Sequence, residues 1–288
     1  MKGQKILIIG GAGFIGSNLC SDLSPLNTVT SLDNYSLGNE SNHVAGVRYI
    51  RGEAAEISKI FIDEKFDYLF HFGEYSRVEQ SFAEIDHVLQ NNINGFLEVL
   101  KFAKDHVGEI IYSASSTVFN KPENGTLLSP YTLSKKINVE ILRNYCFWAN
   151  LRYKIVYFYN AFGPNEISHG PYSTVVAKYI NLINSGHKKL PVHGTGHQTR
   201  NFTHVSDIVS GIILAVTKGK NYDFGIGNPT SWSILDLVRL FEAEPEFLPD
   251  QNGNRKSSPL NNSEILSLGW RPKHALDEYI TKSIKKSY

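Results

Sequence analysis

The stretch Ile9-Gly10-Gly11-Ala12-Gly13-Phe14-Ile15-Gly16 decides the fold of this chain. It follows a short apolar run, Lys5–Ile9, and precedes a helical pattern over Phe14–Leu23, so it is the turn between a first strand and a first helix. Glycines allow a tight turn in which backbone N–H groups approach an anion closely. The N-terminus of the following helix adds roughly half a positive charge. The turn is therefore predicted to bind a pyrophosphate.

An acidic residue stands where a dinucleotide-binding unit needs one. Asp33 ends the second predicted strand, Thr28–Asp33, about 20 residues beyond the glycines. A carboxylate there accepts hydrogen bonds from both adenosine ribose hydroxyls and repels a 2′-phosphate, which favours NAD over NADP. A sheet turn without a cofactor is the plain alternative, because glycine spacing alone is a weak signal.

The rest of the chain continues the alternation of strands and helices. Residues 68–72, 109–113 and 154–159 are further predicted strands, which indicates an α/β fold with a Rossmann-type, doubly wound parallel sheet. After Asn160, glycine–proline pairs separate shorter elements and predict a smaller, loop-rich α/β substrate domain. Residues 1–160, with a helix returning at about 197–220, are expected to form the NAD-binding domain. Residues from about 161 to 196 and from 221 to 288 are expected to form the substrate domain.

Composition excludes several classes of function. The chain has 288 residues, 41% of them hydrophobic, and a formal net charge of +1, so no general attraction to nucleic acid or membrane is expected. Cys20 and Cys146 are far apart, and the ten histidines show no metal-ligand spacing, so neither a disulfide nor a metal site is expected. No signal peptide and no apolar run of about 18 residues is present. A cytoplasmic location is the expectation.

A tyrosine and a lysine four residues apart, Tyr131 and Lys135, open a helical pattern that continues to about Trp148. Residues at this spacing share one face of a helix. With fifteen tyrosines in the chain, one such pair is expected by chance, and a surface contact is the plain interpretation. The preceding strand, however, ends in Ser113-Ala114-Ser115-Ser116-Thr117. Ligands of open α/β sheets bind at that carboxyl edge, which favours a catalytic pair.

These motifs together resemble a known family. The glycine pattern, the hydroxyl cluster and Tyr131-x-x-x-Lys135 are similar to the extended short-chain dehydrogenases, and within them to the NAD-dependent epimerase/dehydratase group. Further matching motifs extend over nearly the whole chain: Asp33-Asn34, Asn92-Ile93-Asn94-Gly95, Asn160-x-x-Gly163-Pro164, residues 194–202 and Leu268-Gly269-Trp270-Arg271-Pro272. The resemblance implies an NAD-dependent enzyme that acts on a nucleotide-diphosphate sugar.

The resemblance also assigns residues to three roles. The catalytic residues that it implies are Tyr131, Lys135, Ser115 and Thr117. The residues expected at NAD are Gly10, Gly13, Phe14, Ile15, Gly16, Asp33, Asn34, Glu53, Ala54, Phe72, Gly73, Glu74, Asn92, Ser113, Tyr131, Lys135 and Phe158. The residues expected at the nucleotide-sugar are Ser115, Ser116, Asn160, Thr174, Val175, Val192, Arg200 and Arg255.

In the chemistry that the resemblance implies, Tyr131 takes the proton of a sugar hydroxyl. Free tyrosine has a pKa of about 10, so a nearby ammonium, that of Lys135, is needed to favour the phenolate. Ser115 and Thr117 position the hydroxyl or relay its proton. NAD⁺ accepts the hydride from the same carbon, most often C4. A 4-epimerase, the favoured hypothesis, then reduces the 4-keto sugar on its other face.

Four alternatives remain beside epimerisation. Dehydratases of the group carry an Asp-Glu pair where Ser116 and Thr117 stand, and decarboxylases keep the glutamate, so a 4,6-dehydratase and a decarboxylase are disfavoured. A C4 dehydrogenase that releases the ketone and regenerates NAD separately would use the same residues. A protein that senses NAD without turnover could lose the Tyr–Lys pair and the hydroxyl cluster, and both are present.

Several positions depart from the family pattern. Glu74 replaces a small residue in a His-x-Ala-Ala turn and is expected to point to ribose hydroxyls or to Arg77. Gln251 stands where a second pyrophosphate-binding arginine is common, and Arg255 is expected to substitute for it. Residues 121–129, before Tyr131, form a shorter segment than in most relatives, so a pocket that is unusually open, or one shaped for a different sugar, is expected.

Two long helices are predicted near residues 84–104 and 132–148. They resemble the family's dimer-forming pair, so a homodimer is expected. Packing of both helices on the sheet would explain their apolar content equally well.

Overall fold

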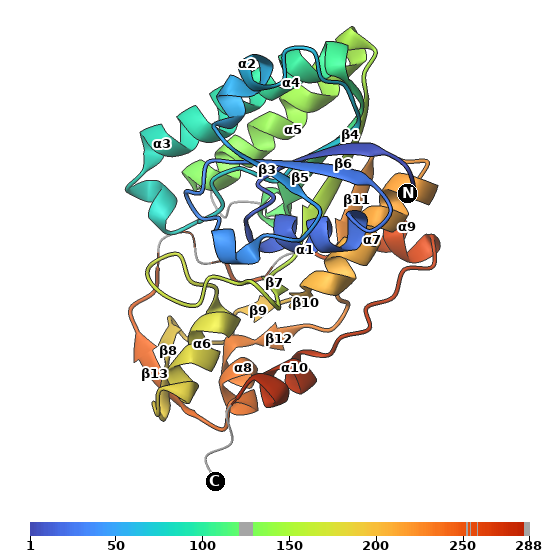
Figure 1. Ribbon diagram of the computed structural model, residues 1–288. Helices are drawn as coiled ribbons and strands as arrows, with labels where there is room; N and C mark the ends of the chain where they lie inside the picture. The colour runs from blue at the N-terminus through green and yellow to red at the C-terminus, as the bar shows by residue number, and fades with distance from the viewer. Residues whose placement is uncertain (121–128, 252, 254, 258, 285–288) are drawn as a thin grey trace.

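A parallel sheet of seven strands forms the centre of the larger part of the molecule (Figure 1). The computed structural model of the protein describes residues 1–120, 129–251, 253, 255–257 and 259–284. The strand order is β11-β6-β5-β4-β1-β2-β3, and every neighbouring pair is parallel. The strands are β1 (Lys5–Ile9), β2 (Thr28–Asp33), β3 (Arg48–Arg51), β4 (Phe66–His71), β5 (Val107–Ser115), β6 (Arg152–Phe158) and β11 (Asp223–Ile226). Chain order reverses between β1 and β4, the switch point at which such sheets bind ligands.

Helices cover both faces of this sheet (Figure 1). Alternation along β1 sends Leu7 and Ile9 into one apolar layer and Ile6 and Ile8 into the other. The first layer is formed with α2 (Ile57–Ile60), α4 (Gly95–His106) and α5 (Pro130–Ala149), and α3 (Ile85–Leu89) precedes α4. The second layer is formed with α1 (Phe14–Leu23), α7 (Val205–Lys218) and α9 (Ser263–Ser267). Short turns of helix are η1 (Glu40–Asn42), η2 (Ala54–Glu56), η3 (Gln80–Phe82), η4 (Gln90–Asn94) and η5 (Ser116–Phe119).

The smaller part lies beyond the carboxyl edge of the sheet (Figure 1). Its helices are α6 (Val175–Asn184), α8 (Ile234–Leu240) and α10 (Leu276–Ser283). Its strands form three pairs: β8 (Lys189–His193) with β13 (Glu244–Leu248), β9 (Thr199–Arg200) with β12 (Trp232–Ser233), and β7 (Ala161–Phe162) with β10 (Thr203–His204). Phe162, Tyr179, Leu190, Leu237 and Ile280 belong to the separate apolar core that holds these elements together.

The predicted elements around the glycine-rich stretch are confirmed, because β1, α1 and β2 begin and end at the expected residues. The helix expected over 84–104 differs in one respect. Its middle, Gln90–Asn94, is a π-helix between α3 and α4. The backbone carbonyl of Asn92 there accepts a hydrogen bond from Asn138 Nδ2 at 2.7 Å, which gives this carbonyl a partner on α5.

Strand β11 shifts the expected boundary between the two parts. Residues 221–288 were expected in the substrate domain, but Asp223–Ile226 pairs with β6 at the edge of the large sheet. Ile265 of α9 and Trp270 pack in the layer under α7. A four-residue strand carries too little periodicity to be placed from sequence. We propose a two-domain division in which β11 and α9 belong to the larger domain.

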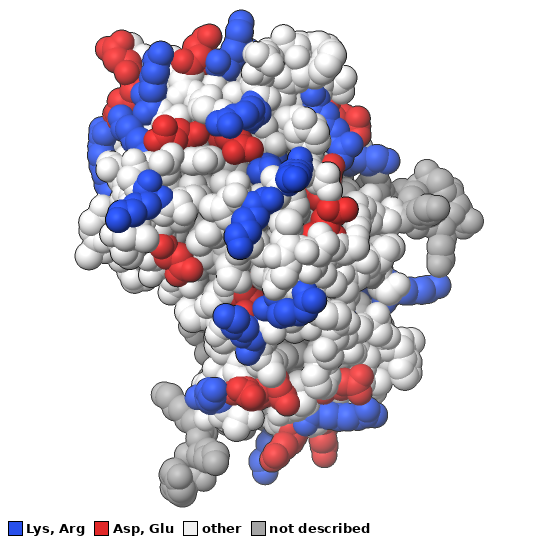
Figure 2. Space-filling model, turned by 90° about the vertical axis from the view of Figure 1, so that its right-hand side faces the viewer, with Lys and Arg blue, Asp and Glu red and all other residues white. Residues whose placement is uncertain are grey.

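The described residues include no helix of the length and apolarity that a membrane span requires. On the face drawn in Figure 2, Lys and Arg side chains are interspersed with Asp and Glu side chains. This mixture agrees with the formal net charge of +1. The face drawn therefore offers no broad basic surface of the kind that binds a nucleic-acid backbone.

Candidate active site

A cavity of about 1180 Å³ lies at the carboxyl edge of the sheet, and residues of both parts of the molecule line it. Nearly all residues predicted for the site line this cavity. They are Gly10, Gly13, Phe14, Ile15, Gly16, Asp33, Asn34, Glu53, Ala54, Phe72, Gly73, Glu74, Ser113, Ser115, Ser116, Thr117, Tyr131, Lys135, Phe158, Asn160, Thr174, Val175, Arg200 and Arg255. The structure therefore brings the three predicted groups of residues to one place. Asn92 and Val192 are the exceptions.

Asn92 is an internal support of the site and does not line the cavity. Its side chain accepts a hydrogen bond from Tyr75 N at 2.7 Å and donates to Ser134 Oγ at 2.9 Å. The residue is fully buried, so the expected contact with the cofactor is wrong. Val192 is also fully buried, whereas its neighbours Pro191 and His193 line the cavity.

The glycine-rich turn has the geometry of an anion cradle. Gly10 has φ +84°, and a Cβ at this position would lie 2.7 Å from the backbone nitrogen of Gly73. A Cβ at Gly16 would lie 2.0 Å from the carbonyl oxygen of Gly10. No side chain caps the N-terminus of α1 at Gly13. The helix thus presents N–H groups and its positive end to the cavity, as a pyrophosphate requires.

The carboxylate of Asp33 is fixed at the end of β2 by two backbone donors. Ala12 N donates to Oδ2 at 2.9 Å and Tyr35 N donates to Oδ1 at 2.8 Å. Each oxygen keeps further acceptor capacity, and the residue lines the cavity. Beside it, Asn34 Nδ2 donates to Glu53 Oε2 at 3.0 Å. Together with the glycine cradle, this acceptor set fits the adenosine ribose and pyrophosphate of NAD.

Tyr131 and Lys135 are placed by the start of α5. Ser129 caps the helix by accepting a hydrogen bond from Thr132 N at 3.1 Å, and Pro130 occupies the first turn. Tyr131 lies in that turn and lines the cavity, and Lys135 follows one turn later. Lys135 Nζ donates to Ser113 O at 2.6 Å. The Lys135 side chain therefore lies against the end of β5, and Tyr131 lines the same cavity.

The hydroxyl cluster continues β5 into η5. Thr117 donates to Ser115 Oγ from its backbone nitrogen at 3.3 Å and from its hydroxyl at 3.0 Å. Ser115 thus accepts from Thr117 twice and can donate its own proton elsewhere. Both residues line the cavity with Tyr131. The cluster can hold a sugar hydroxyl and connect it to a chain of hydrogen bonds.

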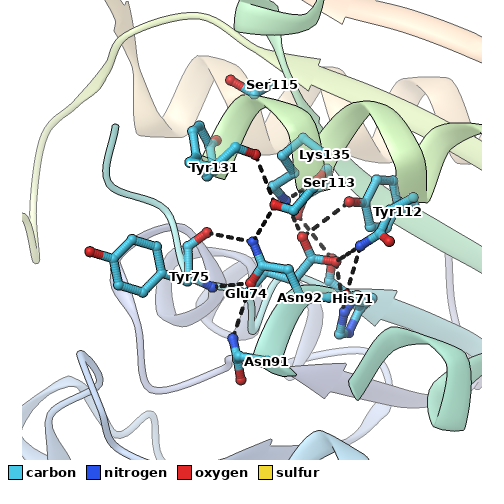
Figure 3. A network of polar contacts seen from close by, with 12 residues as sticks. His71, Glu74, Tyr75, Asn91, Asn92, Tyr112, Ser113, Ser115, Tyr131 and Lys135 are labelled. Carbon is cyan, nitrogen blue, oxygen red and sulfur yellow. Dashed lines mark hydrogen bonds and ion pairs between the residues drawn. The ribbon is translucent and has the colours of Figure 1, made fainter. Parts of the chain in front are cut away.

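Glu74 is the centre of a buried polar network (Figure 3). Its side chain is 1% exposed, and Oε2 lies 2.8 Å from Lys135 Nζ. Tyr112 OH donates to the same oxygen at 3.0 Å, and Asn138 Nδ2 donates to Oε1 at 3.0 Å. His71 Nε2 lies 3.2 Å from Oε1. The carboxylate faces inward, so the expected contact with ribose hydroxyls or Arg77 is wrong.

The charge state of Glu74 follows from its neighbours. Burial by itself would raise the pKa of this carboxyl, but the Lys135 ammonium and His71 outweigh burial, and the pKa is lowered. Glu74 is therefore an anion at neutral pH. The Lys135 ammonium has this carboxylate as its counter-ion inside the protein.

Two arginines that line the cavity, Arg200 and Arg255, contact one another. Arg200 Nη1 donates to the carbonyl oxygen of Arg255 at 2.8 Å. Burial and the charge of Arg255 lower the pKa of Arg200 to about 10. Arg255 Nη1 is buried and has no hydrogen-bond partner among the described residues. Two adjacent, half-buried cations fit a pyrophosphate. The substitution of Arg255 for the arginine missing at Gln251 stays a prediction.

Arg77 also lines the cavity but was not predicted to do so. Its Nε donates to the carbonyl oxygen of Tyr172 at 2.7 Å, and burial lowers its pKa. It stands six positions after His71, the last residue of β4. This short separation in sequence from the carboxyl end of a strand is the signal that could have identified Arg77 as a cavity residue.

Two further expectations concern the surroundings of the site. Residues 121–128, most of the segment expected to be short, lie outside the described residues. In the described part of the chain, no group of three His, Cys, Asp or Glu side chains could hold a metal ion. Cys20 and Cys146 are both buried, free thiols.

The comparisons with known proteins agree with this geometry. The family model of the NAD dependent epimerase/dehydratase family matches residues 6–227. The chain belongs to this family. Its fold is that of the extended short-chain dehydrogenases, and it is an NAD-dependent enzyme.

Relatives within the family carry several activities. The chain is 27% identical to dTDP-D-glucose 4,6-dehydratase of Bos taurus over 98% of this chain and 88% of the relative. It is similar to the structure of UDP-N-acetylglucosamine 4-epimerase from Methanobrevibacter ruminantium, with 27% identity, a TM-score of 0.88 and coverage of 98% and 97%. It is also similar to UDP-glucose 4-epimerase of Thermotoga maritima, with 26% identity, a TM-score of 0.89 and coverage of 96% of both chains. Family membership alone therefore leaves the reaction open.

Proposed function

We propose that the enzyme is a nucleotide-sugar 4-epimerase that works through a 4-keto intermediate. One observation carries this proposal: Tyr131, Ser115 and Thr117 face one cavity, with hydroxyl side chains at Ser116 and Thr117 in the place of the dehydratase acid–base pair. This set of residues can exchange the proton of a sugar hydroxyl. It holds no carboxylate at Ser116 or Thr117 for a second acid–base step.

Binding would be shared between the two parts of the molecule. The glycine cradle at the start of α1 and the Asp33 carboxylate would hold NAD, which supplies the acceptor for the hydrogen at C4. Arg200 and Arg255 would hold the pyrophosphate of the nucleotide-sugar from the opposite side. Both ligands would then meet at the end of β5, where Tyr131 and Ser115 lie.

The proton step would belong to Tyr131. Its phenolic oxygen, as phenolate, would take the proton of the C4 hydroxyl, and the hydroxyl of Ser115 would hold the same oxygen by donating its proton. Thr117 would orient Ser115 through its 3.0 Å hydrogen bond. Reversal of the same proton transfer after the ketone presents its other face would give the C4 epimer.

Arg255 counts further against dehydration. Its Nη2 lies 3.3 Å from Ser116 Oγ and 3.4 Å from Asn160 Oδ1. Ser116 stands where dehydratases of the family have the aspartate of their acid–base pair. In this chain that position therefore has a neutral hydroxyl next to a cation, and neither group accepts a proton at neutral pH.

The test is incubation of the purified enzyme with NAD and UDP-, dTDP-, GDP- and CDP-linked hexoses, with NMR of the products and near-ultraviolet absorbance of reduced NAD. We expect a C4 stereoisomer without accumulation of reduced NAD. Stoichiometric reduced NAD together with a released ketone would instead establish the C4 dehydrogenase. A 4-keto-6-deoxy product, formed by loss of water, would overturn our interpretation of Ser116 and Thr117.

We also propose a homodimer formed through α3–α4 and α5. Large apolar side chains are exposed on these helices: Phe147 is 83% exposed, Trp148 is 75% exposed and Ile85 is 46% exposed. Exposed aromatic side chains of this size are characteristic of contact surfaces. Sedimentation equilibrium should give twice the chain mass, and a Phe147→Ser, Trp148→Ser double variant should sediment as a monomer. A monomeric wild type would contradict this part of the proposal.

A further inference from the structure

The Glu74–Lys135 pair is buried at the place where the proposed base lies. Both side chains are at most 5% exposed, and Lys135 is one helical turn from Tyr131 on the same face of α5. Two of the three ammonium protons of Lys135 are used inside the protein, by Glu74 Oε2 at 2.8 Å and Ser113 O at 2.6 Å. Little freedom is left for the direction of the third.

Stability alone is a poor explanation for such a pair. Removing two charges from water costs free energy that their mutual attraction regains only with excellent geometry, and apolar replacements often stabilise a protein as well or better. The carboxylate here is well hydrogen-bonded, since Tyr112 and Asn138 also donate to Glu74, yet apolar side chains in its place could stabilise the fold as well. A carboxylate beside an ammonium also cancels much of the field that the ammonium exerts on neighbouring groups.

We propose that Glu74 is a positioning residue, which orients the Lys135 ammonium and, by cancelling much of its charge, sets the pH at which Tyr131 loses its proton. This inference rests on the proposed function, in which Tyr131 is the base. The other groups around the pair are His71 on β4 and Tyr112 on β5, with the cations Arg77 and Arg255 on the Tyr131 side. A change of Glu74 alone leaves all of these groups in the chain and removes only the charge at position 74.

Removal of the Glu74 charge should shift the ionisation of both Tyr131 and Lys135 in one direction. In Glu74→Gln the ammonium acts on Tyr131 unopposed, so the phenolate is more stable and deprotonation moves to lower pH. The ammonium also loses its counter-ion while it remains buried, so its own deprotonation moves to lower pH. Both limbs of the kcat–pH profile should therefore move toward acid, by about one pH unit or more. A side chain that served packing alone would reduce kcat without moving the limbs.

A second readout needs neither substrate nor turnover. Tyrosine labelled with ¹³C at Cζ reports phenol ionisation by NMR, and Tyr131 is assigned by the signal that is lost in Tyr131→Phe. The pH at which half of Tyr131 is ionised, its midpoint, should be lower in Glu74→Gln than in the wild type. The control is Glu109→Gln, which removes another Glu–Lys pair of the same sheet, Glu109–Lys154 at 3.8 Å. Glu109 and Lys154 do not line the cavity, so the control should leave the Tyr131 midpoint unchanged.

Glu74→Asp keeps the charge but shortens the side chain by one methylene, which moves the carboxylate away from Lys135. The Tyr131 midpoint should be lowered in this variant too, by less than in Glu74→Gln. If Glu74→Gln does not fold, Glu74→Asp alone tests the inference. An unchanged Tyr131 midpoint in whichever of these variants folds would overturn the inference. A shifted midpoint in an enzyme that is inactive on every nucleotide-sugar would retain the inference about Glu74 and refute the proposed function instead.

Discussion

Replacement of Asp33 by asparagine tests the cofactor site at one carboxylate. The side chain accepts hydrogen bonds from Ala12 N at 2.9 Å and Tyr35 N at 2.8 Å. The remaining acceptor capacity of the carboxylate is assigned to the adenosine ribose hydroxyls. A hydrogen bond to a charged group contributes about 1.5–3 kcal/mol. Loss of the charge and of one acceptor oxygen should therefore weaken NAD binding by roughly 10- to 100-fold.

The same change should alter the preference between cofactors. Asp33→Asn removes the repulsion of a 2′-phosphate, so the ratio of NADP to NAD affinity should rise by at least about tenfold. Calorimetric titration with both dinucleotides measures this ratio. Asp63→Asn is the matched control, because Asp63 is exposed and does not line the cavity. Unchanged affinities for NAD and NADP in Asp33→Asn would refute our placement of the ribose.

Two further changes test other parts of the site, and a third tests how a buried carboxyl affects the stability of the fold. Gly16→Ala puts a Cβ 2.0 Å from Gly10 O, so NAD affinity should fall by about 100-fold or more; calorimetric titration showing wild-type affinity would contradict the cradle. Arg255→Gln should raise KM for the nucleotide-sugar by about 10- to 100-fold and leave the Kd for NAD unchanged; an effect on NAD alone would show that the arginine is misassigned. Burial raises the pKa of Glu166 to about 7, so the folded state holds this proton more tightly than the unfolded chain and stability is lost as pH rises from about 4.5 to about 7. Glu166→Gln should remove this loss of stability, which amounts to about 2 kcal/mol between about pH 5 and about pH 8. The free energy of unfolding in urea, measured against pH, would refute this prediction if the wild type and the variant gave parallel profiles.

Much of the larger domain could be predicted because its signals are local. The glycine-rich stretch lies between a five-residue apolar strand and an amphipathic helix, and each boundary there is fixed by a change of periodicity or by a glycine. The pairing of Tyr131 with Lys135 is equally local, since four residues within one helix determine it. Strand β11 could not be placed, because its four residues join the sheet through a partner about 70 residues earlier in the chain.

The partner of Glu74 depended on contacts that sequence does not reveal. Arg77, three residues away, was the nearest cation in sequence, yet the carboxylate pairs with Lys135, 61 residues further along the chain. The turn after β4 directs the side chain inward, under β5 and α5, where Tyr112 and Asn138 complete its hydrogen bonds. A sequence shows that a carboxylate is unusual at a position, but the tertiary fold decides which charge it meets.

In the proposed reaction, C4 of a nucleotide-sugar loses its hydrogen and regains it on the other face, while Tyr131 removes the hydroxyl proton and then returns it. The most direct measurement is turnover, in water, of a nucleotide-hexose that carries deuterium at C4, with NMR of the recovered sugar. Our account predicts that the C4 epimer retains the deuterium at C4 and that Tyr131→Phe binds both ligands but forms none of this product. Loss of the deuterium to solvent, or full activity in Tyr131→Phe, would contradict it.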